Sequence, residues 1–279
     1  MKKAAIFSDV DGTIYPFPGK NLSQVNIDKT KEINKKNVFF VINTGNGPYE
    51  KIQRLADSLC SRYIVCSNGA LIFDNQEKKI LNIEYISKLE AQKIWDIADT
   101  VDIGLYYFGT HQYYLRNADQ KQIDFMTDFC EYNNWIFDGR IPEDLHKIEA
   151  YGPREKLEKF YNLTKEKNVD LNVVLLDKHI EITKNGVSKG TGMKWLCENI
   201  FDIPLSEVMA IGDSQNDISM FELAGFPYAM ENTDPYTRTF AKYFTSTVEQ
   251  DGLAMAIDDY LYRIDFDLKK EISQGKKHK

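Results

Sequence analysis

Two aspartates near the start of the chain have the spacing of a paired carboxylate site. They belong to the string Asp9–Thr13 (DVDGT), which follows a short apolar run at residues 4–8. Side chains two positions apart on an extended chain point the same way, so the Asp9 and Asp11 carboxylates share one face. Their repulsion favours a bound cation, and Mg²⁺ fits because it takes one or two carboxylates and otherwise prefers water and phosphate oxygens. A polar turn is the alternative, since aspartate and glycine are common turn residues.

Two later strings occupy positions suited to binding an anion. Asn43–Gly45 follows the apolar run at residues 38–42, and a hydroxyl with free backbone N–H groups before a helix can cradle an anion. Taken alone, this string is better explained as an ordinary loop and helix cap. Lys189 lies in the first turn of an expected helix, where the positive end of the helix dipole disfavours a lysine. A bound phosphate would explain that placement, and a solvated surface lysine is the alternative.

A fourth string, Gly212–Asp217 (GDSQND), follows the apolar run at residues 208–211. Asp213 therefore comes at the end of an expected strand, and Asn216 and Asp217 lie in the first turn of the following helix. Helix capping explains one of these acids but not the whole string.

Short apolar runs alternate with helical patterns in both terminal parts of the chain, and this alternation predicts a parallel sheet covered by helices. The expected strands are residues 4–8, 38–42, 63–66, 208–211 and 226–230, and the expected helices are residues 23–36, 48–59, 188–200 and 250–263. Ser23 is the expected N-cap of the first helix, and Pro48 suits the first turn of the second. In open sheets of this kind, ligands bind at the carboxyl ends of the strands, where the polar strings fall.

The middle of the chain has a different pattern of expected strands and helices. Aromatic strands such as Leu105–Phe108 and Tyr113–Leu115 follow one another without an intervening helix, which indicates an antiparallel sheet in an α+β unit. We therefore expect an α/β protein: a Rossmann-like parallel-sheet core with helices on both faces (residues 1–81 and 187–279), plus an inserted α+β cap (residues 82–186).

Composition narrows the class of protein. Hydrophobic residues make up 43% of the 279-residue chain and charged residues 28%, which is ordinary for a globular protein. The net charge of -7 argues against nucleic-acid or anionic-membrane partners. The four cysteines show no metal-binding spacing. No apolar run approaches a signal-peptide core or a membrane span, so we expect a cytoplasmic protein. We also expect either a monomer or a weak homodimer.

Taken together, the four strings resemble those of the haloacid dehalogenase superfamily, and within it the Cof-type phosphatases with a large α/β cap. Asp9–Thr13 matches the first motif, Thr44-Gly45 the second, Lys189-Gly190 the third, and Gly212–Asp217 the fourth. The stretches Ser67–Ala70, Ala229-Met230 with Asn232, and Asp251-Gly252 are also typical of the subfamily.

The resemblance implies a Mg²⁺-dependent phosphatase that forms an aspartyl phosphate. Asp9 would be the nucleophile, and Asp11 would protonate the leaving alcohol and later deprotonate the attacking water. The metal ligands would be the Asp9 carboxylate, the Asp11 carbonyl and the Asp213 carboxylate. The remaining roles are phosphoryl binding by Thr44, Gly45, Lys189 and Asn216, and support by Thr13 and Asp217. The cap would close over the site and select the leaving group.

Three departures from the family pattern bear on the substrate. Asn46 stands where arginine is common, Glu231 stands where glycine is common, and Tyr15–Pro18 replaces an aliphatic continuation of the first motif. A small phosphorylated metabolite, such as a sugar phosphate, a flavin nucleotide or pyridoxal phosphate, fits the resemblance.

Three other functions are compatible with parts of this pattern. A phosphosugar mutase shares the motifs, and a non-enzymatic phospho-ligand sensor would have no need of both Asp9 and Asp11. A two-component receiver domain would be about half as long and would lack the cap. Four tyrosines have rings that could stack on a substrate: Tyr106, Tyr107, Tyr113 and Tyr114. Aromatic residues in strands more often serve in packing.

Overall fold

The computed structural model describes residues 3–275, with side chains as far as residue 265. It divides into two compact units, Met1–Asn43 with Ala56–Tyr63 and Met193–Lys279, and Thr44–Leu55 with Ile64–Gly192. Across residues 3–275, no helix combines the length and apolar character needed to span a bilayer.

The first unit contains a parallel sheet whose strands lie in the order β13-β12-β11-β1-β2. Their bounds are β1 (Ala4–Ser8), β2 (Val38–Asn43), β11 (Val208–Gly212), β12 (Phe226–Ala229) and β13 (Tyr243–Phe244). Every neighbouring pair is parallel, and Ser8 lies opposite both Ile211 and Ile42. The central strands therefore end at the same level, and the residues after them gather at one edge.

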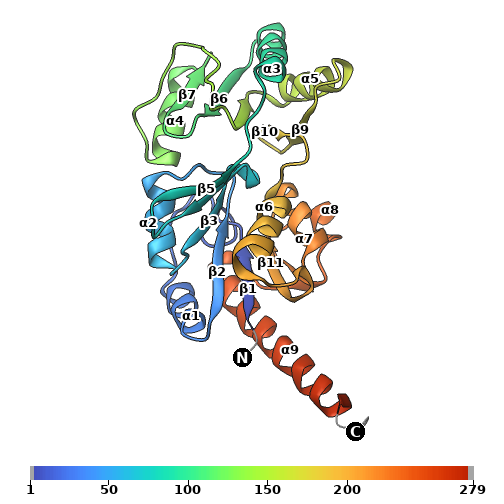
Figure 1. Cartoon of the computed structure of the whole chain (residues 1–279). Coiled ribbons are helices and arrows are strands. Elements are labelled where there is room, and N and C mark those ends of the chain that lie inside the picture. The colour runs from blue at the N-terminus through green and yellow to red at the C-terminus, as the bar shows by residue number, and fades with distance from the viewer. Residues whose placement is uncertain (1–2, 276–279) are drawn as a thin grey trace. The chain divides into compact units, whose positions relative to one another are not determined.

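Helices cover both faces of this sheet. Helix α1 (Gln24–Asn34) packs against β2 and against α9 (Gly252–Gly275), whereas α7 (Ile218–Leu223) packs against β11 and β12. Figure 1 shows α1 and α7 on opposite sides of the strands. The Ser23 side chain accepts a hydrogen bond from the Val25 N–H, which confirms the expected N-cap. The short helix α8 (Pro235–Arg238) follows β12.

Three helix boundaries differ from the sequence expectation. Helix α2 (Glu50–Ser58) begins two residues after Pro48, because the Tyr49 N–H turns back to the Gly47 carbonyl before the first helical bond forms. Helix α6 (Lys189–Leu196) gives way to a π-helical segment, Cys197–Phe201. Helix α9 continues well beyond residue 263.

The second unit holds β3 (Tyr63–Cys66) at its boundary, the antiparallel pair β4 (Leu71–Asp74) and β5 (Lys79–Ile83), and a separate five-stranded sheet. That sheet has the order β7-β6-β8-β10-β9, and all its neighbours are antiparallel. Its strands are β6 (Gly104–Phe108), β7 (Tyr113–Arg116), β8 (Lys147–Tyr151), β9 (Leu171–Leu175) and β10 (His179–Lys184). The predicted fold class, a parallel α/β core with an α+β insertion, is confirmed; the boundaries at residues 82 and 186 stay a prediction.

The two faces of the five-stranded sheet differ in chemistry. One face packs beneath α3 (Lys88–Val101) and α5 (Arg154–Glu166) and is apolar, with Leu105, Ile148 and Ile182 in the buried cluster. Because side chains alternate along a strand, the intervening residues share the other face. There Phe108 lies opposite Lys147, and Glu149 lies opposite Glu181. Helix α4 (Gln120–Cys130) follows β7, and its first turn is closed by a capping box at Asp119.

Candidate active site

Strand β1 carries Asp9 to the sheet edge of the first unit. All five residues of β1 are buried, and the pairing with β11 extends one residue further, because the Asp9 N–H donates to the Ile211 carbonyl at 2.9 Å. The Asp9 side chain is 6% exposed. Asp9 is therefore held beside the end of β11, next to the string that begins at Gly212.

A tight turn follows Asp9. The N–H groups of Thr13 and Ile14 donate to the Val10 carbonyl at 3.2 and 2.9 Å. Gly12 has a left-handed φ of 93°, and a Cβ atom at this position would lie 2.5 Å from Asp213 Oδ2. Glycine is thus required twice over at position 12, for the backbone angle and for the approach of the Asp213 carboxylate.

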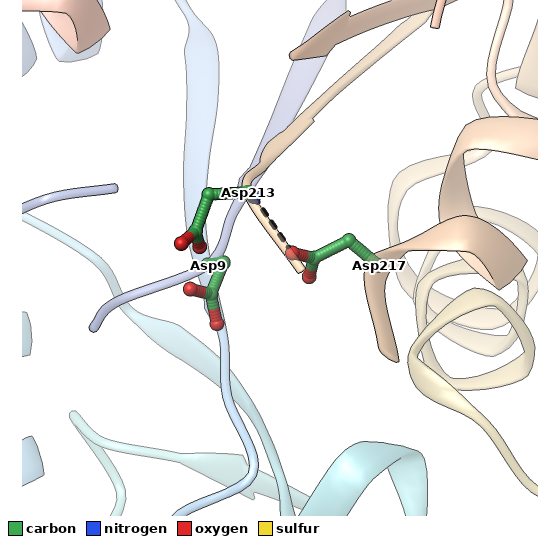
Figure 2. Close-up of side chains that lie close together, drawn as sticks. All are labelled: Asp9, Asp213 and Asp217. Atoms are coloured by element: carbon green, nitrogen blue, oxygen red, sulfur yellow. Dashed lines mark hydrogen bonds between the residues drawn. The ribbon is translucent and has the colours of Figure 1, made fainter. Parts of the chain in front are cut away.

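Three carboxylates gather at this edge. Oxygen atoms of Asp9, Asp213 and Asp217 all lie within 4.8 Å of one another. Figure 2 shows the Asp9 and Asp213 carboxylates side by side, with Asp217 coming from the following helical turn. Asp217 Oδ2 accepts hydrogen bonds from the N–H groups of Asp213 and Ser214, at 2.9 and 3.0 Å. The backbone thus fixes Asp217, which in turn orients the loop bearing Asp213.

The cluster has the chemistry of a Mg²⁺ site. Thr13 Oγ1 donates to Asp213 Oδ1 at 3.3 Å, and Asn232 Nδ2 donates to Asp213 Oδ2 at 3.2 Å and to the Gly12 carbonyl at 3.0 Å. Both donors are neutral groups. Hard oxygen ligands at this separation fit a small divalent cation, and a cation relieves the repulsion among them.

In the second unit, Thr44 follows β2 directly. Its N–H donates to the Val65 carbonyl at 2.8 Å, and its own carbonyl accepts from the Asn68 N–H at 3.0 Å. The Thr44 hydroxyl accepts two hydrogen bonds from Asn46, one from the backbone N–H and one from Nδ2, each 3.1 Å long. The loop that contains Gly45 is therefore fixed by both backbone and side chains.

Lys189 is the first residue of α6 and is almost wholly buried. The start of this helix is held by the segment Ser67–Ala70, where Gly69 has a φ of 91°. A Cβ atom on Gly69 would lie 2.0 Å from the Ser188 carbonyl oxygen. The Ser67–Ala70 stretch therefore supports the residue that precedes Lys189.

Each predicted site residue has a defined place in its own unit. In the first unit, Asp9, Thr13, Asp213 and Asp217 lie together. Asp11 lies half-buried in the turn after Asp9, and the Asn216 side chain accepts a hydrogen bond from the Ser214 hydroxyl. In the second unit, Thr44 and Gly45 form one loop and Lys189 begins α6. Their individual catalytic and binding roles stay predictions.

Comparison with known proteins decides the family. A model of the haloacid dehalogenase-like hydrolases matches residues 6–257, a span that includes all four polar strings and the five-stranded sheet. The chain belongs to the haloacid dehalogenase-like hydrolases. The predicted family and enzyme class, a phosphoric monoester hydrolase of this type, are confirmed.

The hydrolase is similar to curated proteins over most of its length. It is 28% identical to a 5-amino-6-(5-phospho-D-ribitylamino)uracil phosphatase of Bacillus subtilis, covering 89% of this chain and 92% of the relative. It is 26% identical to a phosphatase of the same organism, covering 91% of this chain and 98% of that relative. A solved haloacid dehalogenase-like hydrolase from Bacteroides thetaiotaomicron is 24% identical, with a TM-score of 0.80, covering 92% and 99%. A subclass IIB sugar phosphatase shares the fold at 19% identity, with a TM-score of 0.81 over 92% and 99%.

Several polar residues of this hydrolase were not predicted as site residues. Asn232, part of a subfamily-typical stretch, contacts Asp213 directly. Lys147, Glu149 and Glu181 form a buried ionic cluster on the polar face of the five-stranded sheet. The available signal was charged residues at alternate positions in strands whose other positions are apolar, as in Lys147–Tyr151.

A buried histidine lies next to this cluster. His146 Nε2 is 3.1 Å from Ser67 Oγ, in the segment that supports α6, and its side chain is inaccessible to solvent. Burial lowers the pKa of His146 to about 4, so the imidazole is neutral in the folded protein at neutral pH. Below pH 6.5 the unfolded chain therefore binds a proton that the folded chain does not.

We expect the free energy of unfolding to fall as the pH drops from 6.5 towards 4. Between pH 7.5 and 5.0, His146 alone should account for a loss of about 2 kcal/mol. Urea unfolding of the wild type and of His146→Gln at both pH values measures this contribution, because the substitution removes it. His111→Gln, at an exposed histidine, is the matched control. An equal pH dependence in wild type and His146→Gln would contradict the expectation.

Proposed function

We propose that the protein is a Mg²⁺-dependent phosphatase that hydrolyses a small phosphorylated metabolite, a sugar phosphate or a similar ester. The observation that carries this proposal is the convergence of Asp9, Asp213 and Asp217 at the ends of β1 and β11. Two carboxylates beside a phosphate dianion require a cation, and one nucleophilic carboxylate suffices for a covalent phosphoenzyme. A cytoplasmic monomer or weak homodimer fits this role.

The chemistry proceeds in two displacements. An Asp9 carboxylate oxygen attacks phosphorus, the bond from phosphorus to the ester oxygen breaks, and Asp11 donates a proton to the departing alcohol. Water then attacks the phosphorus of the aspartyl phosphate, Asp11 takes up its proton, and inorganic phosphate leaves as the Asp9 carboxylate is restored. Mg²⁺, held by the Asp9 and Asp213 carboxylates and the Asp11 carbonyl, supplies charge neutralisation when bound.

The remaining site residues position the phosphoryl group. Thr44, Gly45, Asn216 and Lys189 bind its oxygens, while Thr13 and Asp217 orient the Asp213 loop. Residues 82–186 act as a cap that closes over the core formed by residues 1–81 and 187–279. The cap is the part that contacts the leaving group, which makes it the determinant of substrate choice.

The names of similar proteins support a polyhydroxylated substrate. One relative is a phosphatase of a phosphorylated ribitylamino compound, and one protein of the same fold is a sugar phosphatase. Release of inorganic phosphate from a panel of sugar phosphates, flavin mononucleotide and pyridoxal phosphate tests the proposal. Transfer of the phosphoryl group within a sugar without phosphate release would identify a mutase instead.

Lys189→Ala should lower kcat/KM by a similar factor for every ester in this panel. Of the substrate, Lys189 would contact only the phosphoryl group that all these esters share. Loss of a charge-assisted hydrogen bond corresponds to roughly 10- to 100-fold. Substitutions on the core-facing side of the cap, outside the Lys147 cluster, should instead reorder the substrates. A Lys189→Ala enzyme with a changed preference and a normal rate on its best substrate would contradict this placement of the phosphate site.

A further inference from the structure

The buried ionic cluster of the second unit contacts the predicted phosphate-binding loop. Lys147 Nζ donates to the Gly45 carbonyl at 2.6 Å, to Glu149 Oε1 at 2.5 Å and to Glu181 Oε1 at 2.9 Å. An ammonium group has three N–H donors, and all three are used. Lys147 is fully buried, so its position is fixed by these three acceptors.

The charge state of Lys147 follows from its surroundings. Burial alone would lower the pKa of its ammonium group, but the carboxylates of Glu149 and Glu181 outweigh burial and raise the pKa above its ordinary value. Glu149 and Glu181 lie directly opposite each other on β8 and β10, where like charges repel. Lys147 therefore stays charged and holds the two acids together.

Gly45 is packed tightly against this cluster. A Cβ atom at position 45 would lie 2.7 Å from Glu181 Oε1, 3.1 Å from Lys147 Nζ and 3.2 Å from Asn68 Oδ1. The contact between the loop and the five-stranded sheet thus depends on the absence of a side chain at Gly45. Sequence separation makes this a tertiary contact, since Lys147 and Gly45 are 102 positions apart.

The peptide unit between Gly45 and Asn46 is held at both ends. Its carbonyl accepts from Lys147, and its N–H donates to Thr44 Oγ1. The Asn46 side-chain amide donates to the same oxygen. Both acceptor positions of the Thr44 hydroxyl are then occupied, and its single hydrogen has no acceptor among the described residues. The hydroxyl is left as a hydrogen-bond donor.

We infer that Lys147 and Asn46 are positioning residues, which orient the Thr44 hydroxyl so that it donates to a phosphoryl oxygen. This inference rests on the proposed function, in which Thr44 binds phosphate. Lys147 fixes the Gly45 carbonyl. The backbone N–H and the side-chain amide of Asn46 donate to the Thr44 hydroxyl oxygen. The five-stranded sheet thereby acts on phosphate binding through a residue that does not touch phosphate.

The test is the affinity for inorganic phosphate, measured by titration calorimetry of the full chain with Mg²⁺ present. Asn46→Ala and Lys147→Met should each weaken phosphate binding about 10-fold, a typical loss for one hydrogen bond to a charged group. Lys156→Met is the matched control, because Lys156 pairs with Asp102 at an exposed site of the same unit. We expect it to bind phosphate as the wild type does.

A Thr44→Val background separates positioning from a merely structural role. Without the hydroxyl, neither Asn46→Ala nor Lys147→Met should weaken phosphate binding further, because both act through that group. Effects of undiminished size in the Thr44→Val background would overturn the inference. So would wild-type affinity in both single variants.

Lys147→Met removes the ammonium group that lies between Glu149 and Glu181, and the variant can fail to fold for that reason. The triple variant Lys147→Met/Glu149→Gln/Glu181→Gln removes all three charges and takes the place of Lys147→Met. It should weaken phosphate binding about 10-fold when Thr44 is present and cause no further loss in the Thr44→Val background. If the wild type bound no phosphate, the proposed function would fail together with this inference. Phosphate binding that is insensitive to these substitutions would overturn the inference alone.

Discussion

Asp9→Asn should abolish phosphate release and leave no phosphoenzyme to trap. The substitution keeps the size of the side chain but replaces the nucleophilic carboxylate with a neutral amide. Loss of a covalent nucleophile lowers turnover by at least about 10⁴-fold. Rapid acid quenching after incubation with a ³²P-labelled ester detects the covalent species in the wild type. Normal turnover by Asp9→Asn would exclude the covalent mechanism.

Asp11→Asn is the matched variant, because it changes a carboxylate two positions away in the same turn. The nucleophile remains, so phosphoenzyme should still form from an ester with a good leaving group such as p-nitrophenyl phosphate. Hydrolysis of that phosphoenzyme should slow by roughly 10²- to 10⁴-fold, the usual contribution of general acid–base catalysis. Trapped phosphoenzyme in Asp11→Asn and none in Asp9→Asn would together assign the two aspartates.

Removal of divalent cations should reduce turnover roughly 10³-fold or more, since charge stabilisation by a metal ion contributes several kcal/mol. In the proposed mechanism the phosphate dianion approaches Asp9, whose carboxylate lies within 4.8 Å of those of Asp213 and Asp217. Excess chelator followed by dialysis and titration with Mg²⁺ measures both the loss and the recovery. Full activity in the presence of chelator would contradict the proposed magnesium site.

Calcium provides the control for specificity in the same experiment. Ca²⁺ binds the same oxygen ligands at longer distances and with looser geometry, so it should occupy the site yet support little turnover. Asp213→Asn should raise the Mg²⁺ concentration needed for half-maximal activity, because it removes one charged ligand. An unchanged Mg²⁺ requirement in Asp213→Asn would place the metal elsewhere.

The sequence predicted the parallel core well because its strands are buried on both sides. Such strands are short and continuously apolar, as at residues 4–8 and 38–42, and each is followed at once by the polar string it positions. The carboxyl ends of parallel strands lie at the same edge of a sheet, so this edge could be predicted without knowledge of the exact register. The sequence therefore predicted that Asp9 and Asp213 each follow a strand, whereas their pairing as metal ligands was implied by the resemblance to the family.

The five-stranded sheet was predicted as a type of structure but not residue by residue. Alternation shows which side chains share a face within one strand, but the opposition of Glu149 and Glu181 depends on the register between β8 and β10. For the same reason, the sequence did not show which tyrosines of β6 and β7 are packing residues. Tyr107 and Tyr114 stack at 4.9 Å, and Tyr107 belongs to the core beneath α3, whereas Tyr106 lies on the opposite face.

The glycine pair at the start of α6 restricts how this part of the chain can evolve. A Cβ atom on Gly192 would lie 2.9 Å from the Cα atom of Gly69 and 2.5 Å from a Val65 methyl group, so the two backbones touch. A larger residue at one position is usually tolerated when its neighbour becomes smaller. Here the neighbour Gly69 is already glycine and has no side chain to shorten. A larger residue at either glycine therefore has to move the backbone of this contact.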